Sequence, residues 1–232
     1  MSGDYTPARQ LSASALRLIA MFCMLLDHAY RLCPEEWLWM RYAGRIAFPL
    51  FTFLLVEGYE HTRDLRRYAL RLAAFAVISE VPFDLFHTAG DTWFLPSYQN
   101  VGLTLLFGLS AICALDRVDK QLLGGALAAL SCILAYLCRT DYGAVGVALC
   151  VLFFITRGKG HDPAALAIRA IAFLLLFPPV SYASFAIFAL LPIWLYNGQR
   201  GRGGRALQIA GYAFYPAHQL ALAGLLAIST RF

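Results

Sequence analysis

Apolar residues along the chain form long runs, and short polar segments separate them. Most runs are continuous and close to the length of one bilayer crossing, which is typical of transmembrane helices and not of barrel strands. We therefore predict an all-α fold, a polytopic integral-membrane bundle of about nine transmembrane helices. The expected helices cover residues 15–33, 46–59, 68–81, 101–115, 122–138, 143–156, 165–177, 182–196 and 207–228.

Prolines set several of the expected boundaries, because a proline disrupts the interior of a helix. Helix 68–81 should stop before Pro82 and lead into a polar loop from Phe83 to Asn100. Pro178-Pro179 should join the seventh and eighth helices, and the ninth should be interrupted near Pro216. At membrane depth, such an interruption survives only inside protein or beside a water-filled cavity.

The composition supports a membrane location. Of 232 residues, 60% are hydrophobic and 14% are charged, whereas soluble domains average about 50% and about 25%. The net charge of +5 comes from basic residues in short loops, so we attribute it to membrane orientation and exclude a nucleic acid partner. Most Lys and Arg residues fall on the cytoplasmic side when the N-terminus is cytoplasmic and the C-terminus is outside, and we predict that topology.

Residues 1–232 show no internal repeat and no linker, so we expect one compact membrane domain. The polar start of the chain is not a signal peptide, and the first apolar run should stay as an anchor. The six cysteines form no CxxC pair and mostly lie in apolar runs, so we interpret them as core residues and predict no metal. A Cys33–Cys138 disulfide is an alternative, because both residues fall near outer helix ends.

The first apolar run carries Asp27 and His28 side by side. A charged group inside a membrane helix costs roughly 3 kcal/mol or more, so such residues usually face the protein interior and have a function. Neighbouring residues on a helix point about 100° apart, so Asp27 cannot orient His28. Asp27 can reach Arg31, one turn on. His28 then needs a partner from another helix, either as a structural histidine or as a general base.

Further candidates are charged or polar residues near helix ends. Arg63, Arg66, Arg67 and Arg71 form a basic patch at the expected cytoplasmic face, near His61. The patch either fixes orientation at anionic lipid headgroups or binds the phosphates of a cofactor. For Glu57 and Arg45, the simpler interpretation is an ion pair between packed helices. The remaining candidates are Glu80, Asn100, Asp141, Tyr142, Tyr196, Asn197, Tyr215 and His218.

His218 follows Pro216, so it either caps the expected break in the last helix or lines the site. Other catalytic motifs are missing from the sequence: there is no phosphate-binding glycine loop after a strand, no HExxH and no GxSxG. The segment Gly201-Arg202-Gly203-Gly204 is expected to be a flexible cytoplasmic turn.

Several motifs together resemble the TraX family over nearly the whole chain. They are Met24-Leu25-Leu26-Asp27-His28, Gly44-Arg45-Ile46-Ala47-Phe48-Pro49-Leu50-Phe51, Glu57-Gly58-Tyr59, Ser79-Glu80-Val81-Pro82-Phe83, Asn100-Val101, Asp141-Tyr142-Gly143, Tyr196-Asn197-Gly198 and Phe214-Tyr215-Pro216-Ala217-His218. The resemblance implies a multi-pass protein of the bacterial inner membrane. The family's namesake acetylates the N-terminus of the pilus subunit of conjugative plasmids. The fold is similar to that of membrane acyltransferases that use cytosolic acyl-CoA.

In related membrane acetyltransferases, a histidine on an early helix is the catalytic base, and by position His28 would have that role. Acetyl-CoA would dock from the cytoplasm on some of the patch arginines. Arg45, Tyr215 or a freed backbone N–H would stabilise the oxyanion. Asp27 and Glu80 would orient His28 or Arg45. The expected partners are membrane lipid, acetyl-CoA and a pilin or another membrane-bound acceptor.

Two other functions fit the same residues. Buried Asp, Glu and His beside a broken helix are also found in proton-coupled transporters, although the internal repeat of many transporters is missing here. A non-catalytic assembly factor that holds a pilin would need no histidine chemistry.

Overall fold

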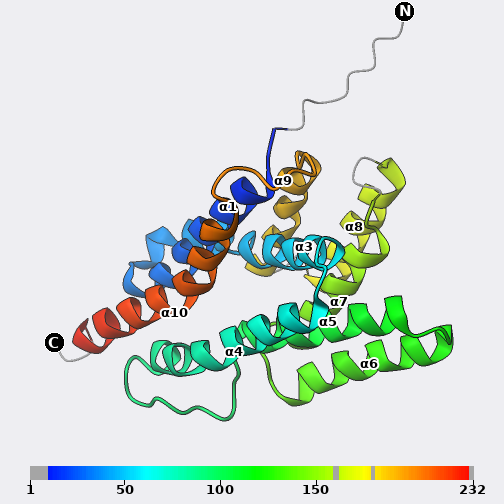
Figure 1. Ribbon diagram of the computed structural model, residues 1–232. Coiled ribbons are helices and arrows are strands. Elements are labelled where there is room, and N and C mark those ends of the chain that lie inside the picture. Colours follow the sequence, from blue (N-terminus) through cyan, green and yellow to red (C-terminus); the bar gives the residue numbers. More distant parts are fainter. Residues whose placement is uncertain (1–9, 159–161, 179–180, 230–232) are drawn as a thin grey trace, which may run out of the picture.

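The computed structural model describes residues 10–158, 162–178 and 181–229, and this part of the chain is helical without β-strands (Figure 1). The predicted all-α fold is therefore confirmed. In chain order, the helices are α1 (Ala13–Ala29), η1 (Tyr30–Leu32), η2 (Glu35–Trp37), α2 (Trp39–Gly44), α3 (Ala47–Glu60), α4 (Leu65–His87), α5 (Val101–Arg117), α6 (Gln121–Leu137), α7 (Gly143–Ile155), α8 (Pro163–Leu176), η3 (Tyr182–Ala189), α9 (Leu190–Trp194) and α10 (Gly204–Ser229).

Side-chain caps define the starts of the helices that matter for the site. The Ser12 hydroxyl accepts a hydrogen bond from Ala15 N at 3.3 Å at the start of α1. Asn100 caps α5, where its Oδ1 accepts from Gly102 N at 2.7 Å. Such caps satisfy backbone N–H groups that have no partner within the helix.

Pro82 does not end the third predicted helix, because α4 continues through it to His87. The predicted stop before Pro82 was therefore wrong, and the loop begins at Thr88 rather than Phe83. A proline inside a helix costs about 3 kcal/mol. Pro82 is buried, and α4 packs along both α5 and α10, so burial of this helix offsets that cost.

Pro216 likewise lies inside a continuous helix, so the predicted interruption near Pro216 was wrong. Helix α10 packs against α1 and α4, and this packing favours a continuous helix through a residue that lacks an N–H donor. The eighth predicted helix also differs, because it consists of a 3-10 segment, η3, followed by the short α9.

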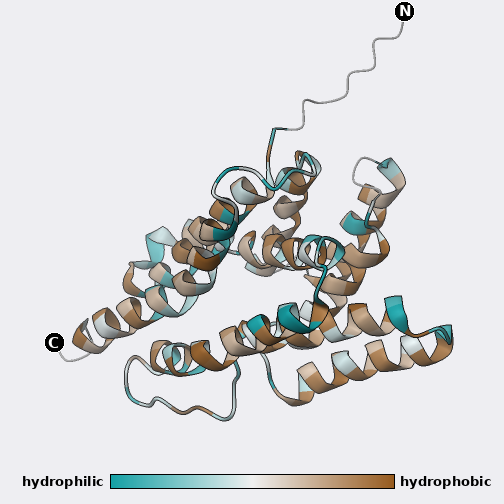
Figure 2. Cartoon of the chain, in the orientation of Figure 1, coloured by the Kyte–Doolittle hydropathy of each residue, from teal (hydrophilic) through white to brown (hydrophobic). Residues whose placement is uncertain are grey.

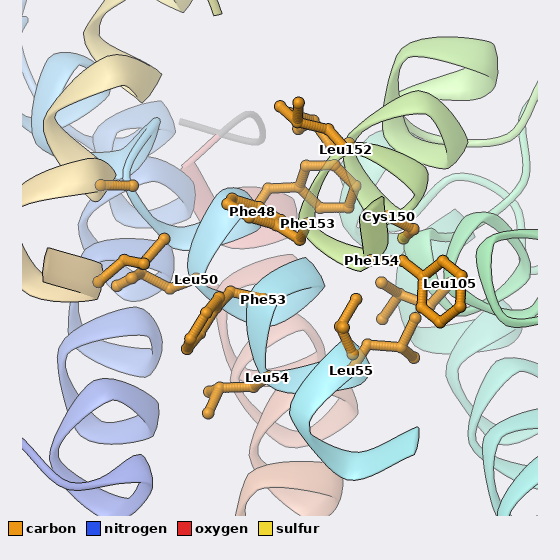
Figure 3. Packing of buried hydrophobic residues seen from close by; sticks show 14 of the residues in the cluster. Phe48, Leu50, Phe53, Leu54, Leu55, Leu105, Cys150, Leu152, Phe153 and Phe154 are labelled. Carbon is orange, nitrogen blue, oxygen red and sulfur yellow. The ribbon is translucent and has the colours of Figure 1, made fainter. Parts of the chain in front are cut away.

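Helix α3 is the centre of the bundle. It contacts α1, α5, α7 and η3, and it is buried on nearly all sides. Figure 3 shows its side chains between the surrounding helices and labels Phe53 of α3 and Phe153 of α7. These two rings meet edge to face with centroids 5.6 Å apart. Residues 47–56 of α3 are almost entirely apolar, as expected for a helix segment buried on all sides.

Large apolar side chains are also exposed on the outer helices, and much of the ribbon of α6 and α10 is coloured as hydrophobic in Figure 2. By length and composition, one segment among the described residues could cross a membrane: Ala13–Leu32, near the N-terminus. Four other apolar helical segments are shorter: Gln121–Leu137, Gly143–Ile155, Pro163–Leu176 and Tyr182–Trp194. The nine-span topology thus stays a prediction.

Two further expectations concern single residues and the ends of the chain. Cys33 and Cys138 are both free thiols, so the alternative of a disulfide between them was wrong. Pro179 of the predicted Pro178-Pro179 link lies outside the described residues, as do both ends of the predicted 1–232 domain.

Gly44 allows α2 to pack closely on α1. A Cβ at this position would lie 2.9 Å from the Asp27 Cα, and it would also meet the Asp27 side chain. We expect Gly44→Ala to lower stability by about 1–3 kcal/mol through overpacking. The measurement is the unfolding free energy of the protein purified in a mild detergent.

Gly125→Ala on α6 is the matched control, because a Cβ there has nothing within 4 Å. It should be neutral or stabilising by up to about 1 kcal/mol, since alanine favours helix over glycine. Equal stability of the two variants would contradict the close packing of α1 on α2.

Candidate functional site

Two cavities lie inside the helix bundle. One has a volume of about 430 Å³ and is lined by Asp27 and His28 of α1, by Arg45, and by Asp141 and Tyr142 before α7. We call it the His28 cavity. The other has a volume of about 460 Å³, and its polar lining includes Arg17, Arg71, Arg200, Glu57, His61 and Tyr68. We call it the basic cavity.

The two cavities share part of their lining. Met24, Phe51, Val101 and Tyr215 line both of them, so the cavities meet at these four side chains. Arg17 and His28 are 11 residues apart on α1, about three helical turns, and therefore lie on the same face at different heights. One face of α1 therefore carries a polar residue in each cavity, Arg17 and His28, with the apolar Met24 between them.

His28 contacts a second histidine from the far end of the chain. His28 Nδ1 lies 2.6 Å from His218 Nε2 of α10. His218 Nδ1 lies 2.7 Å from the carbonyl oxygen of Phe214, one turn earlier in α10. The Phe86 ring packs beside His28, with ring centroids 5.0 Å apart. Among the described residues, His28 Nε2 has no hydrogen-bond partner.

Asp27 is the acidic centre of an arginine cluster. It forms an ion pair with Arg45, and Arg41 Nε lies 3.6 Å from its other carboxylate oxygen. The side chains of Asp27 and Arg45 are only 12% and 15% exposed, so the pair is largely desolvated. Sequence proximity suggested that Asp27 pairs with Arg31, but the structure shows no such pair among the described residues. Arg31 instead donates to the Phe86 carbonyl and lies over the Phe86 ring at 4.7 Å.

Asp141 and Tyr142 close the His28 cavity from the loop before α7. The Tyr98 hydroxyl donates to Asp141 Oδ1 at 2.8 Å. The Tyr142 ring stacks on Phe48 at a centroid distance of 3.7 Å. Burial raises the pKa of Asp141 to about 6, against the opposing effects of the Tyr98 hydrogen bond and the nearby Arg45.

Glu80 and Asn100 form a separate contact. The Asn100 side chain donates to Glu80 and, at 2.7 Å, to the Ala76 carbonyl, and this joins α4 to the start of α5. Neither residue lines the His28 cavity or the basic cavity. Glu80 therefore contacts Asn100 in place of the expected partners His28 and Arg45, and the contact serves packing.

The basic patch divides between two environments. Arg71 and His61 line the basic cavity, whereas Arg63 and Arg66 do not. Arg67 also lies outside the cavity lining and forms an exposed ion pair with Asp64 at 2.9 Å.

Sequence analysis missed two arginines of the basic cavity, Arg17 and Arg200. Arg17 could have been found from its helical spacing to His28. Arg200 lies in the polar connection before α10, which has no periodic pattern to place it.

Glu57 and Asn197 have different surroundings. Glu57 lines the basic cavity and accepts from the Tyr196 hydroxyl at 2.9 Å, so its partner is Tyr196 and not Arg45. Asn197 lines neither cavity, and its Oδ1 accepts from Gln199 N at 2.8 Å within a turn. Within the described ranges, no group of three or more His, Cys, Asp or Glu residues could hold a metal ion.

The fold and site define a helical protein with a histidine pair beside two adjoining cavities, one of them basic. The sequence model of the TraX family, described as TraX protein, matches residues 12–226. The chain therefore belongs to the TraX family.

Two relatives support this assignment. Probable fimbrial assembly protein FimC, serogroup H1, of Dichelobacter nodosus is 31% identical over 89% of this chain and 92% of its own length. Protein TraX of Escherichia coli (strain K12) is 34% identical over 34% of this chain and 31% of its own length. No solved structure matches the chain.

Loss of the Asp27 charge should destabilise the protein. Asp27→Asn leaves the largely desolvated Arg45 and the partly exposed Arg41 without their counter-charge, and we expect a loss of about 3 kcal/mol in unfolding free energy in detergent, the low end of the range for a buried pair. Asp64→Asn is the control, because it removes an exposed ion pair and keeps the N-cap of α4; it should cost less than about 1 kcal/mol. Similar losses of unfolding free energy for the two variants would contradict a desolvated ion pair at Asp27.

Asp141 should make stability depend on pH. The folded state holds its proton more tightly than the ordinary pKa of 3.8 implies, so its contribution to stability is full below that pH and lost as the pH rises to about 6. The melting temperature of the wild type should therefore fall relative to Asp141→Asn between about pH 4 and about pH 7. Other titrating groups are common to both proteins. A constant difference would contradict the raised pKa.

Proposed function

We propose that this protein is an integral-membrane acetyltransferase of the bacterial inner membrane. It would move an acetyl group from cytosolic acetyl-CoA to an amine or hydroxyl acceptor at the opposite face. The observation that carries this proposal is the pair of cavities that meet at one wall. A basic cavity suits a phosphate-bearing donor, and the His28 cavity offers an imidazole nitrogen that has no hydrogen-bond partner in the part of the chain that the structure describes.

Exposed apolar surface supports the multi-pass arrangement. The most exposed large apolar side chains lie on several different helices, and they include Leu122, Leu175, Val77, Ile78 and Ile228. Soluble monomers rarely expose large apolar patches. Helix α6 has 17 residues. It is therefore about 26 Å long, which is close to the ~30 Å hydrocarbon core, and local bilayer thinning accommodates the difference.

The donor would bind in the basic cavity. Arg17, Arg71 and Arg200 line it, and guanidinium groups bind phosphate oxygens through paired hydrogen bonds. The acetyl end of the donor would then reach the apolar wall where the cavities meet. Donor and acceptor would approach from opposite faces, so that CoA never crosses the membrane.

His28 would be the general base. Its Nε2 would accept the proton of the acceptor as the acceptor attacks the thioester carbonyl, which typically contributes about 10²–10⁴ in rate. Tyr215 lines both cavities, which supports its hydroxyl as the group that would donate to the developing oxyanion. Asp27 would hold Arg45 and Arg41 in place.

The relatives' names point to pili. One relative is named as a fimbrial assembly protein and another as TraX. A pilin N-terminus is therefore the first acceptor to test for this chain. The name of the first relative also fits a non-catalytic assembly factor, in which His28 would have no chemical function.

The test uses radiolabelled acetyl-CoA and membranes from cells that express the protein. We expect His28→Ala to remove most label transfer to membrane proteins, by about 10²-fold or more, and to leave the melting temperature and the CoA affinity unchanged. Undiminished transfer by His28→Ala would reject the mechanism, and absence of transfer by the wild type to any fraction would favour the assembly factor.

A second arm tests the donor site. Arg71→Gln and Arg200→Gln should each weaken CoA binding about tenfold, measured as the CoA concentration that half-maximally raises the melting point. Arg63→Gln and Arg66→Gln carry the same change of charge on residues outside the cavity lining, and they should leave CoA binding unchanged. Equal effects of all four substitutions would indicate general surface electrostatics and contradict a bound donor in the basic cavity.

A further inference from the structure

We propose that His218 is a positioning residue that fixes the proton of His28 on Nδ1 and thereby frees Nε2 to act as the base. This proposal rests on the acetyltransferase function proposed above and assigns a role to the second histidine of the pair.

The hydrogen bonds determine the tautomers. A carbonyl oxygen only accepts hydrogen bonds, so the 2.7 Å contact between His218 Nδ1 and Phe214 O requires a proton on that Nδ1. In its neutral form, His218 then has a bare Nε2, which can only accept. The 2.6 Å contact therefore places a proton on His28 Nδ1, and His28 Nε2 is left with its lone pair.

The ring geometry supports a directional bond. The two imidazole planes are 4° apart and their centroids are 4.9 Å apart. Together with the short N···N distance, this means that the rings lie end to end in nearly one plane and are not face to face. The bond therefore points along the lone pair of His218 Nε2. Phe214 stacks on His218 at 4.8 Å and restrains its rotation.

Asp27 cannot supply this function. Although it is adjacent to His28 in sequence, its carboxylate is committed to Arg45 and Arg41. The usual orienting carboxylate of a catalytic histidine is thus replaced by a neutral histidine backed by a main-chain carbonyl. The chain of hydrogen bonds runs from His28 through His218 and ends at the carbonyl oxygen of Phe214 in α10.

The step balances as follows. The acceptor N–H or O–H proton moves to His28 Nε2 while the acceptor atom bonds to the acetyl carbon. The C–S bond then breaks, and CoA leaves as a thiolate that takes the proton back from Nε2. During the step, His28 is an imidazolium whose Nδ1–H bond to His218 becomes charge-assisted and stronger, so His218 stabilises the transition state more than the ground state.

Two substitutions separate positioning from packing. The oxygen of a glutamine side chain can take the place of His218 Nε2, whereas leucine removes the acceptor at similar size. We expect His218→Leu to lower the rate of label transfer from acetyl-CoA about 10- to 100-fold, the range for partners that orient a reactive group. His218→Gln should recover most of that rate. The KM for acetyl-CoA and the melting temperature should stay close to wild type in both.

The double variant gives the decisive comparison. If His218 acts only through His28, then His28→Ala combined with His218→Leu should be no slower than His28→Ala alone. Equal rates for His218→Leu and wild type, or equal losses for His218→Gln and His218→Leu, would overturn the positioning role. An active His28→Ala variant would instead reject His28 as the base, and absence of transfer by the wild type would reject the proposed function, so the failures are distinguishable.

Discussion

The ion pair between Asp27 and Arg45 is the interaction on which the site depends. A carboxylate inside an apolar helix is stable only with a cation beside it, and the close approach of α2 to α1 at Gly44 brings Arg45 and Arg41 to it. Because neighbouring residues on a helix point about 100° apart, the next residue on α1 points in a different direction. His28 therefore faces the cavity and α10, where His218 supplies its partner.

The two cavities follow from the same helix. Arg17, Met24 and His28 lie along one face of α1, and α3, α5 and α10 provide the rest of the wall between the cavities. Charged groups thus lie on both sides of the wall that separates the two cavities. For the proposed reaction, this division would let a thioester arrive from one face and an acceptor from the other, while bulk water stays outside the point where they meet.

Much of the helical pattern was predictable, since long apolar runs specify helices whatever surrounds them. Pro82 and Pro216 misled the prediction, because local propensity is weak against the packing of α4 on α10. The pairing of His28 with His218 could not be read from the sequence, because 190 residues separate them. Glu80 was assigned to other neighbours, because the sequence does not show that α4 continues past Pro82 and packs beside the start of α5, where Asn100 lies.

The central claim is that a donor and an acceptor meet from opposite faces of a membrane at His28. Sealed vesicles prepared in both orientations test it most directly, with radiolabelled acetyl-CoA, which does not cross the bilayer, added outside. The account predicts that inside-out vesicles transfer the label to acceptors in their lumen and that right-side-out vesicles transfer none. Equal labelling in both orientations, or label confined to acceptors on the outer surface of inside-out vesicles, would contradict it.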